Sequence, residues 1–314
     1  MLLALFRIYS PITERGGSHA VEIIDAHHHI WQMKNLPWLV GEPVPRIFGE
    51  YDSIRRDYPI EEYLADIRKC GVSKTVYVQV NWIPDQELDE THWVQSVASK
   101  FGCPNAIVGF ADLAKSDVEE TLAAHLESPL FRGVRQQLHW HTNAQYRFAS
   151  RPDLMNDSQW RRGFALLEKF GLVFELQIFA SQMADGARLA GDFPETTIVL
   201  EHSGMLEDRS EAGWTQWRTG MRLLAKNSNV YTKISGLGTF LHRFDRDAIR
   251  SVILETIEIF GADRCMFGSN FPIEKIWTDY PTLFYGTASI LDELNGTEKA
   301  AVLGDTAKRI YRPA

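Results

Sequence analysis

The 314-residue sequence is poor in cysteine and has no dense block of positive charge. Its three cysteines, Cys70, Cys103 and Cys265, lie far apart and match neither a zinc-finger nor a Cys-x-x-Cys spacing, which argues against a disulfide scaffold. The 33 Lys and Arg residues are scattered among 41 Asp and Glu residues, and the net charge is −8. Nucleic acid and anionic membrane surfaces are therefore not expected as partners, and a cytoplasmic location is expected.

Long apolar runs and nucleotide-binding motifs are also missing. No apolar run is long enough to cross a bilayer, and the apolar start of the chain is shorter than the apolar core of a signal peptide. No Gly-x-Gly-x-x-Gly follows the first strand-like run, and no Walker phosphate loop is present. Residues 1–20 are predicted to be a poorly ordered extension in front of one domain that spans residues 21–314.

The sequence does contain eight apolar runs of strand length, separated by helical patterns. The runs are Val21–Ala26, Thr75–Val80, Ala106–Ala111, Gly133–Leu138, Leu172–Ile178, Thr197–His202, Val230–Ser235 and Arg264–Ser269. Most are continuously apolar, as expected for a parallel sheet that is buried on both faces. Eight strand–helix units predict an α/β fold, a single-domain (β/α)₈ TIM barrel, with an open doubly wound sheet as the alternative.

The first predicted strand ends in the run Asp25-Ala26-His27-His28-His29. Because successive side chains on a strand point to opposite faces, His27 and His29 are predicted to share a face with Asp25. Two imidazoles at a strand end can hold one cation or orient a polar substrate. The C-terminal ends of barrel strands are also where active sites lie, so this run is the first candidate site.

Polar residues stand near the ends of other predicted strands. They are Gln79, Arg135, Gln177, Glu201, His202, Lys233 and Asn270. Alternation predicts that His202 points away from the face that carries Glu201. Ordinary structural roles remain open for several of them: an ion-pair partner for Arg135, a core histidine for His202, a solvated edge position for Lys233 and a turn residue for Asn270.

Two connections, residues 30–59 and 139–156, are long for a compact domain and are predicted to cover the active site. The first contains Trp31, which could stack on a ring, and both contain arginines. With Arg135, these arginines favour an anionic or polyhydroxylated small molecule as the substrate. His139 and His141 repeat the His-x-His spacing, but their position in a loop favours a surface or lid role.

Four segments carry a resemblance to a known family: Ile24–Trp31, Phe131–Arg135, Val199–Gly204 and Arg264–Pro272. On these segments, the chain from about residue 21 onward resembles the amidohydrolase superfamily. It is most similar to the lactonase-like branch of amidohydrolase 2 type, which includes sugar-lactone hydrolases and 2-pyrone-4,6-dicarboxylate lactonase. The resemblance implies a (β/α)₈ barrel that hydrolyses a small lactone, such as a sugar-acid or dicarboxylate lactone, at its C-terminal mouth.

The resemblance also implies roles for individual residues. The family's first-strand histidine pair corresponds to His27 and His29 and its sixth-strand histidine to His202, so these three are the implied metal ligands. Zinc is the first divalent ion expected in an imidazole-rich site. The family's eighth-strand aspartate is Asn270 here, which cannot take a proton at neutral pH, and Gln177 stands near the place of a fifth-strand histidine. Since some lactonase relatives work without metal, a metal-free site remains open.

Lactone hydrolysis requires a base for the attacking water and a stabilised carbonyl oxygen. His202 is the first choice of base because imidazole titrates near the working pH, with Asp25 and Glu274 as weaker candidates. Asn270 would orient the water, and Arg135 with the first-strand histidines would hold the oxyanion if no metal is present.

The predicted catalytic residues are thus His202, Asn270 and Arg135. The predicted substrate-binding residues are Trp31, Gln79, Arg135, Gln177 and Lys233. A metal-dependent decarboxylase or amide hydrolase on the same barrel, and a ligand-binding barrel without turnover, are the alternative functions. The sequence does not fix the oligomeric state.

Overall fold

A computed structural model of the chain describes residues 21–314, so the predicted extension at residues 1–20 lies outside the described residues. Eight strands form one parallel sheet whose spatial order follows the sequence from β1 to β8. The strands are β1 (Ile23–His28), β2 (Val72–Val78), β3 (Ala106–Gly109), β4 (Phe131–Arg135), β5 (Val173–Leu176), β6 (Ile198–Leu200), β7 (Val230–Ile234) and β8 (Cys265–Phe267). All eight predicted strands and the (β/α)₈ barrel are confirmed.

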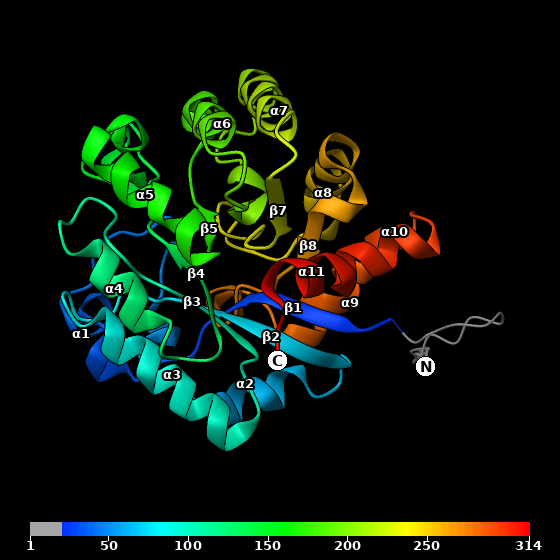
Figure 1. Cartoon of the computed structure of the whole chain (residues 1–314). Coiled ribbons are helices and arrows are strands. Elements are labelled where there is room, and N and C mark those ends of the chain that lie inside the picture. Colours follow the sequence, from blue (N-terminus) through cyan, green and yellow to red (C-terminus); the bar gives the residue numbers. More distant parts are fainter. Residues whose placement is uncertain (1–20) are drawn as a thin grey trace, which may run out of the picture.

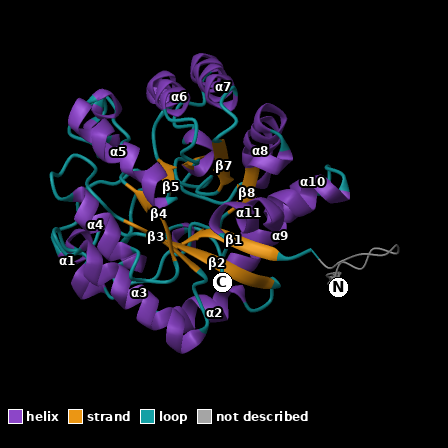
Figure 2. Ribbon diagram, in the orientation of Figure 1, coloured by secondary structure: helices purple, strands orange, loops and turns teal. Residues whose placement is uncertain are grey.

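Helices surround the strands on the outside (Figures 1 and 2). They are α1 (Pro37–Val40), α2 (Ile60–Ile67), α3 (Glu87–Phe101), α4 (Val118–His125), α5 (Ser158–Phe170), α6 (Met183–Asp192), α7 (Glu211–Ala225), α8 (Arg246–Phe260), α9 (Tyr280–Leu291), α10 (Gly296–Ala300) and α11 (Thr306–Tyr311). Between residues 21 and 314, none of these helices combines the length and apolarity needed to cross a membrane. The cytoplasmic location stays a prediction.

The segment after β8 closes the barrel against the end of β1. The backbone N–H of Asn270 donates to the carbonyl of His27 at 2.7 Å, and the N–H of His29 donates to the carbonyl of Phe271 at 2.7 Å. These two hydrogen bonds hold the first-strand histidines and Asn270 side by side at the same mouth of the barrel.

The inside of the barrel has an apolar lower part. Its buried cluster includes Ile24, Ala26, Val76, Val78, Ala106, Val108, Val173, Val199 and Met266, together with Ala307 and Tyr311 of α11. A second, larger apolar cluster fills the space between the strands and the surrounding helices. Polar groups at the upper ends of the strands therefore stand on a closely packed base that fixes their positions.

Strand β1 contains a bulge just before its histidines. Asp25 pairs with Thr75 of β2, whereas His28 pairs with Tyr77, so three steps along β1 correspond to two steps along β2. One extra residue in a strand shifts the alternation of all later side chains to the other face.

The bulge overturns the prediction that Asp25 shares a face with His27 and His29. Asp25 faces the helix layer, where its Oδ2 accepts hydrogen bonds from the hydroxyls of Tyr63 at 2.8 Å and Tyr280 at 3.0 Å. The ring of His27, by contrast, lies against His29 and His202. Asp25 consequently lies on the other side of β1 from the rings of His27 and His29, which argues against the expectation that it could serve as a base.

Candidate active site

Three buried imidazoles meet at the upper end of the barrel. The ring centroid of His27 lies 5.0 Å from that of His29 and 4.8 Å from that of His202. These residues, here called the histidine trio, lie at the C-terminal end of β1 and just after the C-terminal end of β6. The predicted convergence of the three side chains is present in the structure.

Hydrogen bonds orient the trio so that nitrogen lone pairs remain free. Nδ1 of His29 donates to the carbonyl of Val78 at 2.7 Å, which leaves Nε2 of His29 as an acceptor. Nδ1 of His202 lies 2.9 Å from Oγ of Ser235. Nε2 of His27 is buried and has no hydrogen-bond partner within residues 21–314. Nε2 of His29 is therefore left to accept a proton or a metal ion, and Nε2 of His202 lies 3.8 Å from Oε2 of Glu201.

Burial keeps the trio uncharged. It lowers the pKa of His29 to about 3, an effect that Arg135 reinforces. It lowers the pKa of His202 to about 4, although Glu201 opposes the shift, and it holds the pKa of His27 well below the ordinary value. The expectation that His202 titrates near the working pH is wrong, because burial outweighs its carboxylate neighbour. Neutral imidazole is, however, the form that accepts protons and binds metals.

The backbone at the end of β6 directs two adjacent side chains to the same place. His202 has φ 56° and Ser203 has φ 48°, both in the left-handed region. This turn breaks the alternation that predicted opposite faces for Glu201 and His202, because both side chains face the barrel centre. Nδ1 of His27 lies 3.4 Å from Oε1 of Glu201. Gly236 makes room for the His202 ring, since a Cβ there would lie only 2.6 Å from its Nδ1.

A column of buried charges lies beside the trio. Nζ of Lys233 is 2.7 Å from Oε1 of Glu175, which also accepts a hydrogen bond from the hydroxyl of Tyr311. Nη1 of Arg135 is 3.2 Å from Oε2 of Glu201. Burial opposes the ionisation of Glu201, but Arg135, His202 and Lys233 together outweigh burial and keep the pKa of Glu201 below its usual value. The sequence analysis gave no role to Glu175 or Tyr311, and only the position of Glu201 beside His202 signalled its importance.

Two groups of side chains have the chemistry to hold a divalent metal. The trio supplies three neutral nitrogens, which matches the protein ligand number of catalytic zinc sites. A second group consists of His27, Glu175 and Glu201, whose ligating atoms lie within 4.8 Å of one another. Lys233 already places an ammonium in that second group, with Nζ 3.5 Å from Nδ1 of His27. Within residues 21–314, this second group is the one whose three ligating atoms lie within 4.8 Å of one another, whereas the trio contributes the unpartnered Nε2 of His27.

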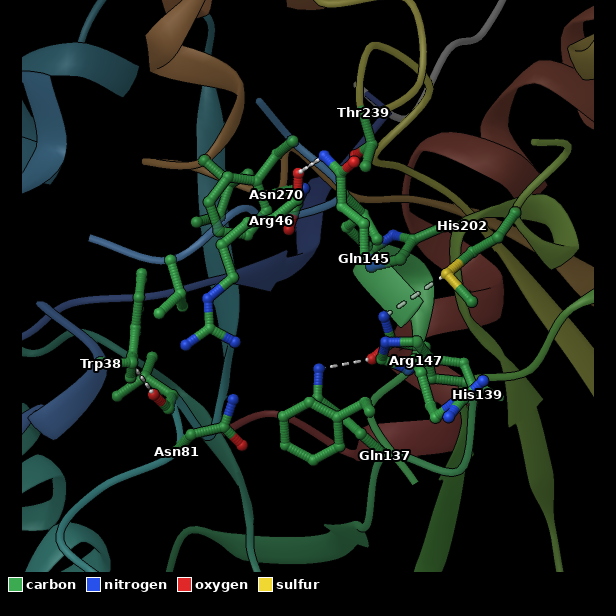
Figure 3. A pocket seen from close by; sticks show the side chains of 18 of the residues that line it. Trp38, Arg46, Asn81, Gln137, His139, Gln145, Arg147, His202, Thr239 and Asn270 are labelled. Carbon is green, nitrogen blue, oxygen red and sulfur yellow. Dashed lines mark hydrogen bonds between the residues drawn. The ribbon is translucent and has the colours of Figure 1, made fainter. Parts of the chain in front are cut away.

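A cavity of about 270 Å³ opens above the trio (Figure 3). Residues at strand ends line its lower part, among them His29, Asn81, Arg135, Gln137, Gln177, His202 and Asn270. The predicted site residues Trp31 and Gln177 therefore reach the cavity. Gln79 and Lys233, also predicted to bind substrate, do not line it. Gln79 accepts a hydrogen bond from the backbone N–H of the lining residue Asn81, and Lys233 pairs with the buried Glu175.

The two long connections form the roof of the cavity, as predicted. Trp38, Arg46 and Phe48 come from the first, and Gln145, Arg147 and Phe148 come from the second. Nε2 of Gln145 donates to the carbonyl of Arg46 at 3.2 Å, which joins the two loops.

The roof arginines differ in how their guanidinium groups are used. Arg147 donates to the carbonyls of His141 at 3.1 Å and Thr142 at 3.2 Å. Arg46 points into the open centre of the cavity in Figure 3, and its buried Nε has no hydrogen-bond partner within residues 21–314. Arg46 is therefore the guanidinium best placed to bind a ligand.

Trp31 and His139 have different surroundings from those expected. Trp31 is 1% exposed, donates its indole N–H to the carbonyl of Arg56 at 2.7 Å and packs edge-on against Trp38. It is mainly a wall residue. His139 was expected at the surface or in a lid, but it is buried, lines the cavity and has a pKa lowered to about 3 by burial.

Comparison with other sequences gives a consistent family match. A family model described as amidohydrolase matches residues 24–312. The uncharacterised protein y4mH of Sinorhizobium fredii is 37% identical over 93% of this chain and 99% of its own length. L-fucono-1,5-lactonase of Burkholderia ambifaria is 28% identical over 92% of this chain and 95% of its own length.

Solved structures share the fold. An amidohydrolase of Burkholderia multivorans with bound zinc has a TM-score of 0.79 at 23% identity, covering 93% of this chain and 100% of that one. A probable 2-pyrone-4,6-dicarboxylic acid hydrolase of Acinetobacter baumannii has a TM-score of 0.71 at 12% identity, covering 93% and 99%. A 2,6-dihydroxybenzoate decarboxylase from Rhizobium has a TM-score of 0.62 at 16% identity, covering 93% and 98%.

Proposed function

Because this chain belongs to the amidohydrolase family, we propose that it opens a small lactone by water attack in the cavity above the histidine trio. The observation that carries the proposal is the convergence of three neutral imidazoles and Arg135 beneath a cavity of about 270 Å³. Relatives named L-fucono-1,5-lactonase, which align along nearly the whole chain, support lactone hydrolysis over other reactions of this fold.

The residues of the trio and their neighbours have different roles in the proposed reaction. Neutral His202 accepts the proton of the attacking water at Nε2, while its Nδ1 stays hydrogen-bonded to Ser235. Asn270 orients that water and cannot deprotonate it. Arg135, at the floor of the cavity, stabilises the negative charge that develops on the carbonyl oxygen, because neutral His29 presents an acceptor and not a donor at Nε2.

In an alternative, metal-bound form the trio would hold a divalent ion through the three Nε2 atoms, and His202 would then be a ligand in place of the base. Zinc is the first choice for such a ligand set. A bound ion supplies Lewis-acid chemistry, which polarises a carbonyl and lowers the pKa of water. Zinc in the related Burkholderia multivorans structure supports this assignment.

The substrate is proposed to carry a carboxylate or several hydroxyl groups. Arg46 presents a guanidinium with an unpartnered Nε, which suits a carboxylate. The amides of Asn81, Gln137, Gln177 and Asn270 line the same space and can bond hydroxyl groups. Sugar-acid lactones and dicarboxylate lactones both meet this description.

A lactone panel with a pH indicator tests the proposal. The wild-type protein, with its metal content measured, is expected to release acid from at least one lactone. His202→Asn should lower kcat/KM by about 100-fold or more, because a general base contributes about 100- to 10,000-fold. His92→Asn, a change at an exposed histidine on α3, is the matched control and should behave as wild type.

Three outcomes would contradict the proposal. Acid release by His202→Asn within a few-fold of wild type would remove the assigned base. Carbon dioxide release from an aromatic acid would identify a decarboxylase, and ligand binding without any product would identify a binding protein.

A further inference from the structure

A second, much smaller chamber of about 20 Å³ lies behind the cavity wall and contains the side chain of Glu274. Glu274 begins a short 3₁₀ turn, Glu274–Ile276, after β8, and it is 1% exposed. The other lining residues come from the end of β7, from α8 and from α9, and none of them is charged or titratable. Among the described residues that line the chamber, none places a cation beside this buried carboxyl group.

The surroundings of Glu274 favour the neutral acid. Its Oε1 is buried and has no hydrogen-bond partner within residues 21–314, while its Oε2 is packed so closely against Gly238 that no Cβ would fit there. A carboxylate in this place would be poorly solvated, and the neutral form avoids that cost. Burial accordingly raises the pKa of Glu274 to about 8, against the opposing effect of hydrogen bonding to Asn270, Gly238 and Thr239.

Glu274 is also adjacent to a residue of the active site. Its backbone N–H donates to the carbonyl of Asn270 at 3.2 Å, which places the two residues one turn apart. Asn270 lines the main cavity and has φ 56°, in the left-handed region. Thr239, another neighbour of the Glu274 carboxyl, lines the main cavity as well. The chamber and the cavity thus share a wall.

We propose that Glu274 is a positioning residue that, as a neutral carboxylic acid, donates its O–H to Oδ1 of Asn270 and so directs the Asn270 amide N–H into the cavity. The directed N–H can hold the attacking water or the carbonyl oxygen of the substrate. An ionised Glu274 can only accept a hydrogen bond, so the Asn270 amide would turn its N–H away from the cavity. The consequence for catalysis depends on the proposed lactone hydrolysis.

The loop that packs against Glu274 carries Arg243, which pairs with Asp245 at 3.0 Å, and His242, whose Nε2 donates to the carbonyl of Ile47 at 3.1 Å. Beyond the chamber wall, Ser235 contacts His202, whose pKa is lowered to about 4 by burial and which is therefore already neutral. The neighbouring Lys275 is directed away, with Nζ 2.8 Å from Glu62 and 2.6 Å from Asp66. A change in activity near pH 8 would therefore report on Glu274.

The pH dependence of kcat/KM tests this role. In wild type, activity should fall as the pH rises through about 8, because the hydrogen-bond donor is lost. Glu274→Gln keeps an N–H donor, so it should stay within about threefold of wild type and lose the alkaline fall. Glu274→Met has no donor and should lower kcat about tenfold with little change in KM.

Glu90→Gln is the matched control. Glu90 on α3 is another buried carboxyl with a pKa raised by burial, to about 7, but it bonds Tyr77 and the backbone N–H of the wall residue Val80 rather than Asn270. This variant should keep the alkaline fall. An unchanged alkaline fall in Glu274→Gln would overturn the proposal.

A measurement without substrate separates this proposal from the proposed function. The side-chain amide signal of Asn270 in an NMR spectrum, assigned with Asn270→Asp, should shift in wild type with a midpoint near pH 8. It should not shift in Glu274→Gln. An Asn270 signal that is independent of pH in wild type would overturn the positioning role even if lactones are hydrolysed. A shifting signal would support it even if no lactone is found.

Discussion

Strand β1 and the residue that follows it carry buried histidines and a buried carboxylate, and the surroundings of these side chains differ between the two faces of the strand. On the helix side, Asp25 accepts four hydrogen bonds, from Tyr63, Tyr280 and the backbones of His27 and Ser269. His28, on the same side, stacks on Tyr63 with ring centroids 3.9 Å apart. On the barrel side, His29 lines the main cavity and His27 keeps an unpartnered Nε2.

The comparison shows which observations indicate function. Burial lowers the pKa of both His28 and His29, so a shifted pKa does not distinguish the two faces. The distinction lies in access to the cavity, because Nε2 of His28 is held 3.0 Å from Oγ1 of Thr75, away from that space. Changes on the helix side should therefore affect stability, and changes at the cavity should affect turnover.

The largest expected effect is a loss of stability when a buried ion pair on the barrel side is broken. Lys233→Met leaves Glu175 buried without its cation and should lower the free energy of unfolding by about 3–5 kcal/mol. The double variant Lys233→Met/Glu175→Gln should recover much of this loss. Urea denaturation measures both variants. Equal stability of the single and double variants would show that the buried pair is not the cause.

The next largest expected effect is the contribution of His202 to the pH dependence of the free energy of unfolding. The pKa of His202 is about 4 in the folded protein, against about 6.5 in the unfolded chain. The lowered pKa of His202 thus contributes about 3 kcal/mol to the free energy of unfolding above pH 6.5. This contribution is lost as the pH falls toward 4. Urea midpoints near pH 7 and near pH 4 should differ less in His202→Asn than in wild type. The exposed His92→Asn should keep the wild-type difference.

Asp25→Asn tests the helix side. Asparagine offers one acceptor oxygen in place of two, so at least one donor among Tyr63, Tyr280, His27 and Ser269 loses its partner. The free energy of unfolding should fall by about 2 kcal/mol. Activity per folded molecule should stay within about twofold, because Asp25 does not line the cavity. A large loss of kcat without a loss of stability would contradict the prediction that the helix side affects stability and the barrel side affects turnover.

Arg46→Gln should give the smallest effect. If Arg46 binds a carboxylate of the substrate, its loss should raise KM about tenfold for an anionic lactone with little change in kcat. An uncharged lactone turned over by the same enzyme is the control and should show a smaller change. Equal changes for the two lactones would contradict the proposed ligand for Arg46.

The barrel could be predicted from the sequence because each strand is a local apolar run and each unit repeats the same pattern. The trio could also be predicted, since His27, His29 and His202 stand at strand ends. The direction of Asp25 could not, because the bulge in β1 depends on pairing with Thr75 and Tyr77, which are distant in the sequence.

The turn at His202 escaped prediction for a related reason. A left-handed non-glycine residue is uncommon, and here the ring is held by Ser235 and by the space above Gly236. The same long-range contacts determine that Lys233 pairs with Glu175 and that Glu274 has a chamber of its own. Alternation along a strand predicts a face only while the strand stays regular.

The most direct test of the central claim compares two adjacent histidines in one assay. The value of kcat/KM for a lactone should fall by about 100-fold or more in His29→Asn, because the change removes a cavity-lining imidazole proposed to hold the metal ion. In His28→Asn, kcat/KM corrected for the folded fraction should stay within a few-fold of wild type. Equal losses in the two variants, or a larger loss in His28→Asn, would contradict an active site on the barrel side of β1.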